Sequence, residues 1–196
     1  MQTKRPFYVT ILGDGAVGKT TLVKLLMNNE FNIADLKTKR TPFLEVEILK
    51  INKEKLLIYD LAGQDNLAHP LRVLEDQVLG HAHLIIFAFA LDRFSSLAHL
   101  GSWYLPIKDY YVKKNKNLPK MILVGTKADQ ARKLDRVLID KVLSSTKIKE
   151  YVPTSSVSGD GIPELKQKLF SLLSEEPNMK FAFSAHKAVE AAPLLN

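Results

Sequence analysis

The residues with the clearest capacity for chemistry lie near the start of the chain, from Gly13 to Thr20. They read Gly-Asp-Gly-Ala-Val-Gly-Lys-Thr and satisfy the pattern G-x-x-x-x-G-K-[ST], whose glycines let backbone N–H groups approach phosphate oxygens closely. Lys19 adds a cation to such a loop, and the hydroxyl of Thr20 is a suitable ligand for Mg²⁺. The pattern therefore predicts a phosphate-binding loop that takes a nucleoside triphosphate together with Mg²⁺.

Three later stretches predict which nucleotide this loop binds. Residues 60–64 read D-x-x-G-Q, which supplies an acid for the water shell of the metal and a glycine N–H for a γ-phosphate. Residues 126–129 read T-K-x-D, and the Asp129 carboxylate can accept two hydrogen bonds from N1 and N2 of guanine. Adenine lacks those donors, so ATP would leave the same carboxylate desolvated and unpaired. Residues 154–157, Thr-Ser-Ser-Val, form the third stretch.

The elements that must position these stretches follow from the pattern of apolar residues. Apolar and β-branched runs alternate with helical patterns, which is typical of βα units around a largely parallel sheet. We expect strands at 7–12, 84–90, 121–125 and 151–152, an antiparallel hairpin from 44–48 and 56–59, and helices at 20–28, 71–79, 95–111, 135–143 and 163–173. Pro106 should end or kink the third of these helices.

Composition limits the class of protein. The chain has 196 residues, of which 46% are apolar and 25% charged, as in one soluble globular domain. It has no cysteine, which excludes disulfides, cysteine-ligated zinc, a thiolate nucleophile and a prenyl or thioester anchor. Gln2 stands where N-myristoylation requires glycine, and the longest apolar run, 84–91, is too short to span a membrane. We therefore expect a cytoplasmic protein without a lipid anchor or a transmembrane segment.

Charge is the remaining global signal. The net charge is +7, with basic clusters at 37–40 and 113–116 that we interpret as exposed loops able to reach an anionic membrane surface. The five histidines show no metal-ligand spacing, and the aromatic residues at 103–111 fit a half-buried helix rather than a platform for bases. No nucleic-acid partner is expected.

Taken in order, the four motifs resemble those of the Ras-like small GTPases, whose phosphate loop, D-x-x-G-Q, [NT]-K-x-D and T-S-A-K elements occur at similar spacings. The resemblance covers residues 6–175. It implies an α/β fold with a six-stranded, mostly parallel sheet, one antiparallel edge strand and helices on both faces. Residues 1–176 would be the G domain and 177–196 a tail or extra helix. The subfamily stays open, because 41–47 is similar to the Arf branch, Ala62 to Ras and Rab proteins, and T-K-x-D to Rho proteins.

The resemblance also implies an activity, the hydrolysis of GTP to GDP and phosphate, which is slow without an activating protein. Gln64 would orient the attacking water, Lys19 would neutralise phosphate charge, and a switch I threonine would ligate Mg²⁺ together with Thr20 and Asp60. That threonine is either Thr41, which we favour because it directly precedes the strand, or Thr38. The residues expected to contact nucleotide are Gly13, Asp14, Gly15, Ala16, Val17, Gly18, Lys19, Thr20, Thr21, Phe31, Thr41, Asp60, Gly63, Thr126, Lys127, Asp129, Ser155, Ser156 and Val157.

The family's regulation and three departures from its pattern complete these expectations. Loss of the γ-phosphate would release switch I and residues 63–71, so effectors, an exchange factor and an activating protein are the expected partners. Thr126 stands where Asn is commoner, which removes an amide that braces the phosphate loop. Val157 replaces a frequent Lys, at a position that contributes mainly a backbone N–H to guanine O6. Arg40 is interpreted as an exposed basic residue rather than a catalytic arginine.

Two other functions fit parts of the sequence. A P-loop ATPase or kinase needs a substrate lid or a second domain, and the chain between the motifs has no spare length for one. A nucleotide-bound scaffold that scarcely hydrolyses GTP is disfavoured by Gln64, Gly15 and Lys19. Because intrinsic hydrolysis in this family is slow, that alternative stays open.

Overall fold

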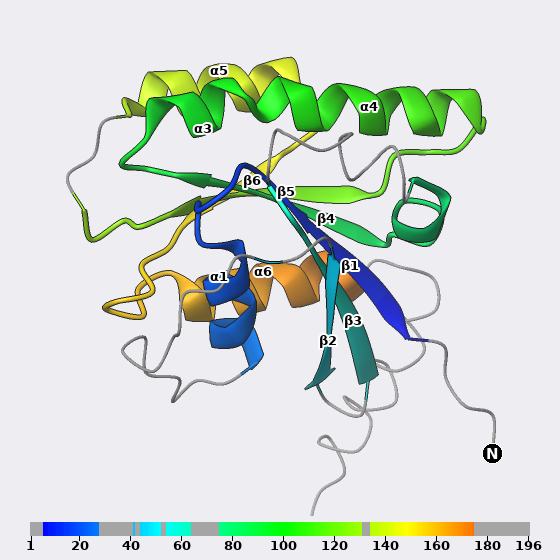
Figure 1. Cartoon of the computed structure of the whole chain (residues 1–196), viewed down its shortest axis with the longest axis horizontal. Helices are drawn as coiled ribbons and strands as arrows, with labels where there is room; N and C mark the ends of the chain where they lie inside the picture. Colours follow the sequence, from blue (N-terminus) through cyan, green and yellow to red (C-terminus); the bar gives the residue numbers. More distant parts are fainter. Residues whose placement is uncertain are drawn as a thin grey trace, which may run out of the picture.

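A six-stranded sheet with helices on both faces dominates the computed structural model, which describes residues 6–27, 41, 44–51, 54–63, 75–130 and 134–174 (Figure 1). The elements in chain order are β1 (Phe7–Leu12), α1 (Lys19–Met27), β2 (Leu44–Ile51), β3 (Glu54–Leu61), β4 (Leu84–Ala90), α3 (Phe94–Ala98), α4 (Leu100–Lys113), β5 (Lys120–Thr126), α5 (Arg136–Ser145), β6 (Glu150–Pro153) and α6 (Ile162–Ser174). The predicted helix at 71–79 is described only from residue 75, and 75–78 are helical.

The strand order is β2-β3-β1-β4-β5-β6, and every neighbouring pair is parallel except β2 with β3. The antiparallel register runs from Leu44 opposite Leu61 to Ile51 opposite Glu54. The predicted hairpin is therefore confirmed, with longer strands than expected. The mostly parallel six-stranded sheet with one antiparallel edge strand is confirmed as well.

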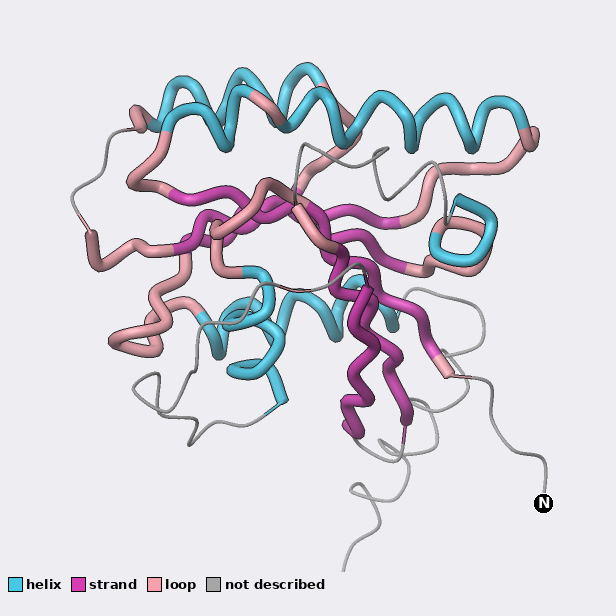
Figure 2. Tube along the Cα trace, viewed as in Figure 1, coloured by secondary structure: helices cyan, strands magenta, loops and turns pink. Residues whose placement is uncertain are grey.

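The two faces of the sheet carry different helices. In Figures 1 and 2, α3, α4 and α5 cover one face, and α1 and α6 cover the other. Alternation along β1 explains this arrangement, because Val9 and Ile11 pack with α1 and α6, whereas Leu12 packs with the aromatic side of α4. All seven residues of β4 are buried, as expected of a central strand covered on both faces.

Pro106 was expected to end or kink its helix, and the expected end is wrong because Pro106 lies inside α4. The single helix expected at 95–111 is divided at His99 instead, between α3 and α4, and α4 continues through Pro106 to Lys113. Proline inside a helix costs about 3 kcal/mol. Burial of the aromatic face of α4, which includes Trp103 and Tyr110 on either side of the proline, offsets that cost.

The parallel strands bring their carboxyl ends to one edge of the sheet. The residues that follow β1, β3, β4, β5 and β6 therefore lie along the same edge, and the four motifs lie at the ends of β1, β3, β5 and β6. In the part of the chain that the structure describes, none of the helices combines the length and apolarity needed to cross a bilayer.

Candidate functional site

The loop between β1 and α1 lies in close contact with the neighbouring strands. Gly13 has a φ of +141°, and a Cβ there would lie 2.0 Å from the carbonyl oxygen of Ala88 in β4. A Cβ on Gly63, just after β3, would lie 2.3 Å from the carbonyl carbon of Asp14. Only glycine fits at either position. The D-x-x-G segment is thus pressed directly against the phosphate loop.

Lys19 closes this loop from inside. Its Nζ donates to the carbonyl oxygens of Gly13 at 2.8 Å and Asp14 at 2.9 Å, and the residue is 6% exposed. Burial lowers the pKa of Lys19 from 10.5 to about 8; the charges of Asp60 and Asp14 oppose this shift, and Arg93 adds to it. A buried ammonium at the centre of the loop is well suited to an anionic ligand.

Three oxygen-bearing side chains meet at the start of α1. The Thr20 hydroxyl donates to Asp60 Oδ2 at 2.5 Å and lies 2.8 Å from the Thr41 hydroxyl. Because Thr20 has one hydroxyl hydrogen and gives it to Asp60, the Thr41 hydroxyl donates to Thr20. Thr41 therefore belongs to this cluster, whereas Thr38 lies outside the described residues.

The cluster fits a magnesium ion. Asp60 is 1% exposed, its burial raises the pKa of the carboxyl, and its Oδ1 is buried without a hydrogen-bond partner among the described residues. A buried carboxylate oxygen without a donor is costly unless a cation meets it. Two hydroxyls and a carboxylate are hard oxygen ligands of the kind Mg²⁺ prefers.

The segments after β5 and β6 are joined through Asp129. Its Oδ1 accepts a hydrogen bond from the Ser155 hydroxyl at 2.6 Å, and the Ala128 N–H donates to the Thr154 carbonyl at 3.0 Å. The Ser155 bond fixes the orientation of the carboxylate while leaving it lone pairs for further donors. The T-K-x-D and T-S-S-V stretches thus form one polar unit.

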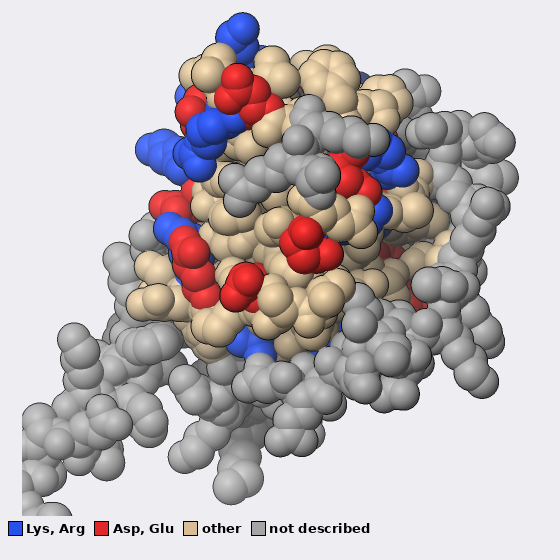
Figure 3. All heavy atoms as spheres, turned by 90° about the vertical axis from the view of Figure 1, so that its left-hand side faces the viewer, with Lys and Arg blue, Asp and Glu red and all other residues tan. Residues whose placement is uncertain are grey.

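Two neighbours of this unit, Val157 and Lys127, make contacts within the protein. The N–H of Val157 donates to the Ser155 hydroxyl at 3.2 Å, so it closes its own turn instead of standing open toward a base. Lys127 has a left-handed φ of 58°, and its Nζ lies 3.3 Å from Asp92 Oδ2. Figure 3 views the molecule from the side of the strands' carboxyl ends and shows acidic and basic side chains interspersed there.

Thr126 braces the phosphate loop even though it is not an asparagine. Its hydroxyl lies 2.5 Å from the carbonyl oxygen of Val17 and 3.0 Å from that of Phe89. One hydroxyl hydrogen serves these two acceptors, so the brace is a single shared donor. The expectation that the substitution removes the brace is therefore corrected, because the threonine hydroxyl replaces the amide.

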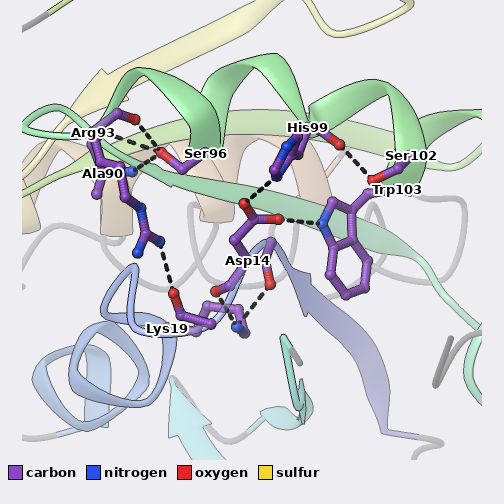
Figure 4. A network of polar contacts seen from close by, with 10 residues as sticks. Asp14, Lys19, Ala90, Arg93, Ser96, His99, Ser102 and Trp103 are labelled. Carbon is purple, nitrogen blue, oxygen red and sulfur yellow. Dashed lines mark hydrogen bonds and ion pairs between the residues drawn. The ribbon is translucent and has the colours of Figure 1, made fainter. Parts of the chain in front are cut away.

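Three residues that sequence reasoning did not place in the site hold the loop from outside (Figure 4). Trp103 Nε1 donates to Asp14 Oδ1 at 3.1 Å, and His99 Nδ1 lies 2.9 Å from Asp14 Oδ2. Arg93 Nη2 donates to the carbonyl oxygen of Gly15 at 2.7 Å. The sequence offers one indirect signal of these contacts, because the Asp14 carboxylate needs hydrogen-bond donors once it is buried.

Two predicted site residues, Phe31 and Gln64, lie outside the described residues, as does Arg40. Thr21 lies in the first turn of α1 and Ser156 in the turn after β6, and both are half-buried. The remaining predicted residues line the carboxyl edge of the sheet described above.

Comparison with known proteins identifies relatives of the whole fold. The model of the Ras family matches residues 8–174. The rat Ras-related protein Rab-15 is 27% identical over 131 residues, which are 65% of this chain and 57% of the relative. Septum-promoting GTP-binding protein 1 of Schizosaccharomyces pombe is 32% identical over 122 residues, 62% of this chain and 57% of the relative. The Ras-like GTP-binding protein RHO1 of Entamoeba histolytica is 25% identical over 171 residues, which are 84% of this chain and 75% of the relative. The match to Rab-15 thus spans little more than half of that relative's length.

Proposed function

Because the chain belongs to the Ras family of small GTPases, we propose that it is a guanine-nucleotide switch that binds GTP with Mg²⁺ and hydrolyses it to GDP and phosphate. The observation that carries the proposal is the meeting of two groups of side chains at one edge of the sheet. The hydroxyl and carboxylate cluster of Thr20, Thr41 and Asp60 suits a metal and phosphates, and the Asp129–Ser155 pair suits a guanine.

In the proposed reaction a water oxygen attacks the γ-phosphorus, and the bond from that phosphorus to the β–γ bridging oxygen breaks. The water's proton passes to the released phosphate, and negative charge moves onto GDP. Lys19 stabilises this charge, while backbone N–H groups at the start of α1 hold the phosphates. Gln64 orients the water. Mg²⁺, held by Thr20, Thr41 and Asp60, supplies further positive charge when bound.

The base is selected by hydrogen bonding. The Asp129 carboxylate accepts from guanine N1 and N2, and the Ser155 hydroxyl keeps it in place for this role. Adenine offers no such donors, so ATP would leave the lone pairs of Asp129 that do not serve Ser155 without donors from the base. Lys127, Ser156 and Val157 line the base and Phe31 packs on it.

The biological output follows from the fate of the γ-phosphate. Thr41 contacts Thr20 where the phosphate loop enters α1, and Gly63 lies against Asp14 and Gly15 at the start of the loop. Loss of the γ-phosphate would remove the ligand proposed to hold both segments. Effectors would distinguish the two nucleotide states through these segments. An exchange factor and an activating protein would set the rates of loading and hydrolysis.

We further propose that residues 1–176 form the G domain and that 177–196 are a tail or an extra helix outside it. The protein works in the cytoplasm in this account. Peripheral contact with anionic membranes would come from the basic loops or the tail, because clustered lysines are attracted to such surfaces.

Single-turnover phosphate release tests the hydrolysis step. Preloaded [γ-³²P]GTP should yield phosphate from the wild type, and Gln64→Leu should slow this release at least about tenfold, as expected when a water-positioning group is lost. Gln77→Leu, an exposed glutamine in the helical turn at 75–78, is the matched control and should hydrolyse at the wild-type rate. Equal rates of phosphate release in wild type and Gln64→Leu would show that Gln64 has no part in hydrolysis. If none of the proteins released phosphate, the chain would be a nucleotide-bound scaffold instead of a GTPase.

A further inference from the structure

Arg93 is held in place by its own backbone contacts. It directly precedes α3, with φ −138° and ψ 103°, and its N–H donates to the Ala90 carbonyl at 3.0 Å. Its carbonyl accepts from the Ser96 N–H at 3.2 Å and from the Ser96 hydroxyl at 2.7 Å. Ser96 is 2% exposed. The origin of the Arg93 side chain is therefore fixed relative to β4.

The guanidinium of Arg93 reaches the phosphate loop, and one of its donors has no partner among the described residues. Nη2 donates to the Gly15 carbonyl at 2.7 Å, and Figure 4 shows the side chain pointing from the start of α3 toward the loop. Nε is buried and has no hydrogen-bond partner among the described residues. A buried, charged N–H without an acceptor is unfavourable, so this group is arranged for an acceptor that the described residues do not provide.

Gly15 marks the end of the loop at which Arg93 acts. A Cβ on Gly15 would lie 3.2 Å from the carbonyl oxygen of Gly63, the residue proposed to meet the γ-phosphate. Arg93 therefore contacts the loop beside the γ-phosphate position rather than beside the base.

The local charge balance also favours an anion. Lys19 Nζ and Arg93 Nη2 are neighbouring cations, because they donate to the carbonyl oxygens of three successive loop residues, Gly13, Asp14 and Gly15. Two neighbouring cations repel each other in a partly dehydrated site, and an added anion relieves that repulsion. The triphosphate carries one phosphate group more than the diphosphate at this end, so it relieves the repulsion more.

We propose that Arg93 is a resident cation of the γ-phosphate end, which positions the loop through Gly15 and favours GTP over GDP. This inference rests on the proposed function and adds to it a second fixed cation besides Lys19. It also predicts that part of the preference for the triphosphate depends on charge, and this part is separable from bracing of the loop.

Two substitutions at Arg93 are compared by their effects on GTP and GDP. Arg93→Gln loses the charge and, because its side chain ends short of Nη2, also the bond to the Gly15 carbonyl, whereas Arg93→Lys keeps the charge. Loss of bracing alone should weaken both nucleotides equally, whereas loss of charge should weaken GTP more. Arg136→Gln is the matched control, because Arg136 is an exposed arginine on α5 that pairs with Asp140. The readout is the ratio of GTP to GDP affinity, measured by competition with Mg²⁺ present at 50 and 500 mM salt. Urea unfolding of each GDP-loaded protein checks that it is folded.

Arg93→Gln should lower the GTP-to-GDP affinity ratio about tenfold at 50 mM salt, and less at 500 mM because salt screens the charge. Arg93→Lys should keep most of the ratio, and Arg136→Gln all of it. A wild-type ratio in Arg93→Gln, or an equal loss of both affinities, would overturn the inference and leave Arg93 as a brace only. If the wild type binds neither nucleotide, the proposed function itself fails, so the two failures are distinguishable.

Discussion

At the scale of single residues, Thr126 carries a brace that its side-chain type would not suggest. Its hydroxyl is shared between the carbonyl oxygens of Val17 and Phe89 and is buried. Thr126→Val keeps the shape but removes the donor, which should lower the free energy of unfolding by about 1–3 kcal/mol because buried carbonyls lose their partner. Urea denaturation measures this change. Thr126→Ser keeps the hydroxyl and is the control; if serine costs as much as valine, the hydroxyl is not the stabilising group.

Lys19 should give the free protein a pH dependence of known sign. Its folded pKa is about 8 and the ordinary value is 10.5, so between these values the unfolded chain binds more protons than the folded one. The free energy of unfolding therefore rises with pH in this window, by up to about 1.4 kcal/mol per pH unit from this group. Nucleotide-free wild type and Lys19→Met should differ in the slope of unfolding free energy from pH 8 to 10. Parallel slopes would show that Lys19 does not titrate there.

At the scale of elements, α4 is tied to the phosphate loop through Asp14. Trp103→Phe keeps an aromatic ring in the core but leaves Asp14 Oδ1 without its donor at 3.1 Å. This change should destabilise the fold by about 1–3 kcal/mol and speed GDP release several-fold, because the loop loses a support. Urea unfolding and the release of a fluorescent GDP analogue measure the two effects.

Tyr104→Phe is the matched control for that experiment. Tyr104 is buried on the same helix, and its hydroxyl accepts from the Lys147 N–H rather than from the loop. The Tyr104→Phe variant should have a lower free energy of unfolding than the wild type but should release GDP at the wild-type rate. If both variants release GDP at the wild-type rate, α4 does not support the nucleotide site.

The elements were largely predictable because apolar periodicity is a local signal. The fully apolar run at 84–90 and the alternation at 44–48 gave the central strand and the antiparallel edge strand. The continuation of α4 through Pro106 was not predictable, because it depends on burial of one helix face against the sheet. The destabilising effect of a proline inside a helix can be predicted from the local sequence, but the tertiary packing that offsets it cannot.

At the scale of the whole molecule, some residues of the site could be predicted from the sequence and others could not. Thr20, Asp60, Asp129 and Ser155 occur in motifs that follow strands, and the sheet brings them to one edge. The outer contacts of Arg93, His99 and Trp103 join residues 78, 85 and 89 positions apart in the chain. No motif encodes those separations, since they arise only when the α3–α4 region packs over the sheet beside the phosphate loop.

The central claim is that the protein binds a guanine nucleotide with Mg²⁺, and its single tryptophan offers the direct test. Trp103 contacts the phosphate loop, so its fluorescence should respond when nucleotide fills the site. Nucleotide-free protein is titrated with Mg²⁺–GTP and with Mg²⁺–ATP while Trp103 emission is followed. We expect saturable binding of GTP and at least about a hundredfold weaker binding of ATP, because adenine offers no donors to Asp129. Equal or tighter binding of ATP would contradict it.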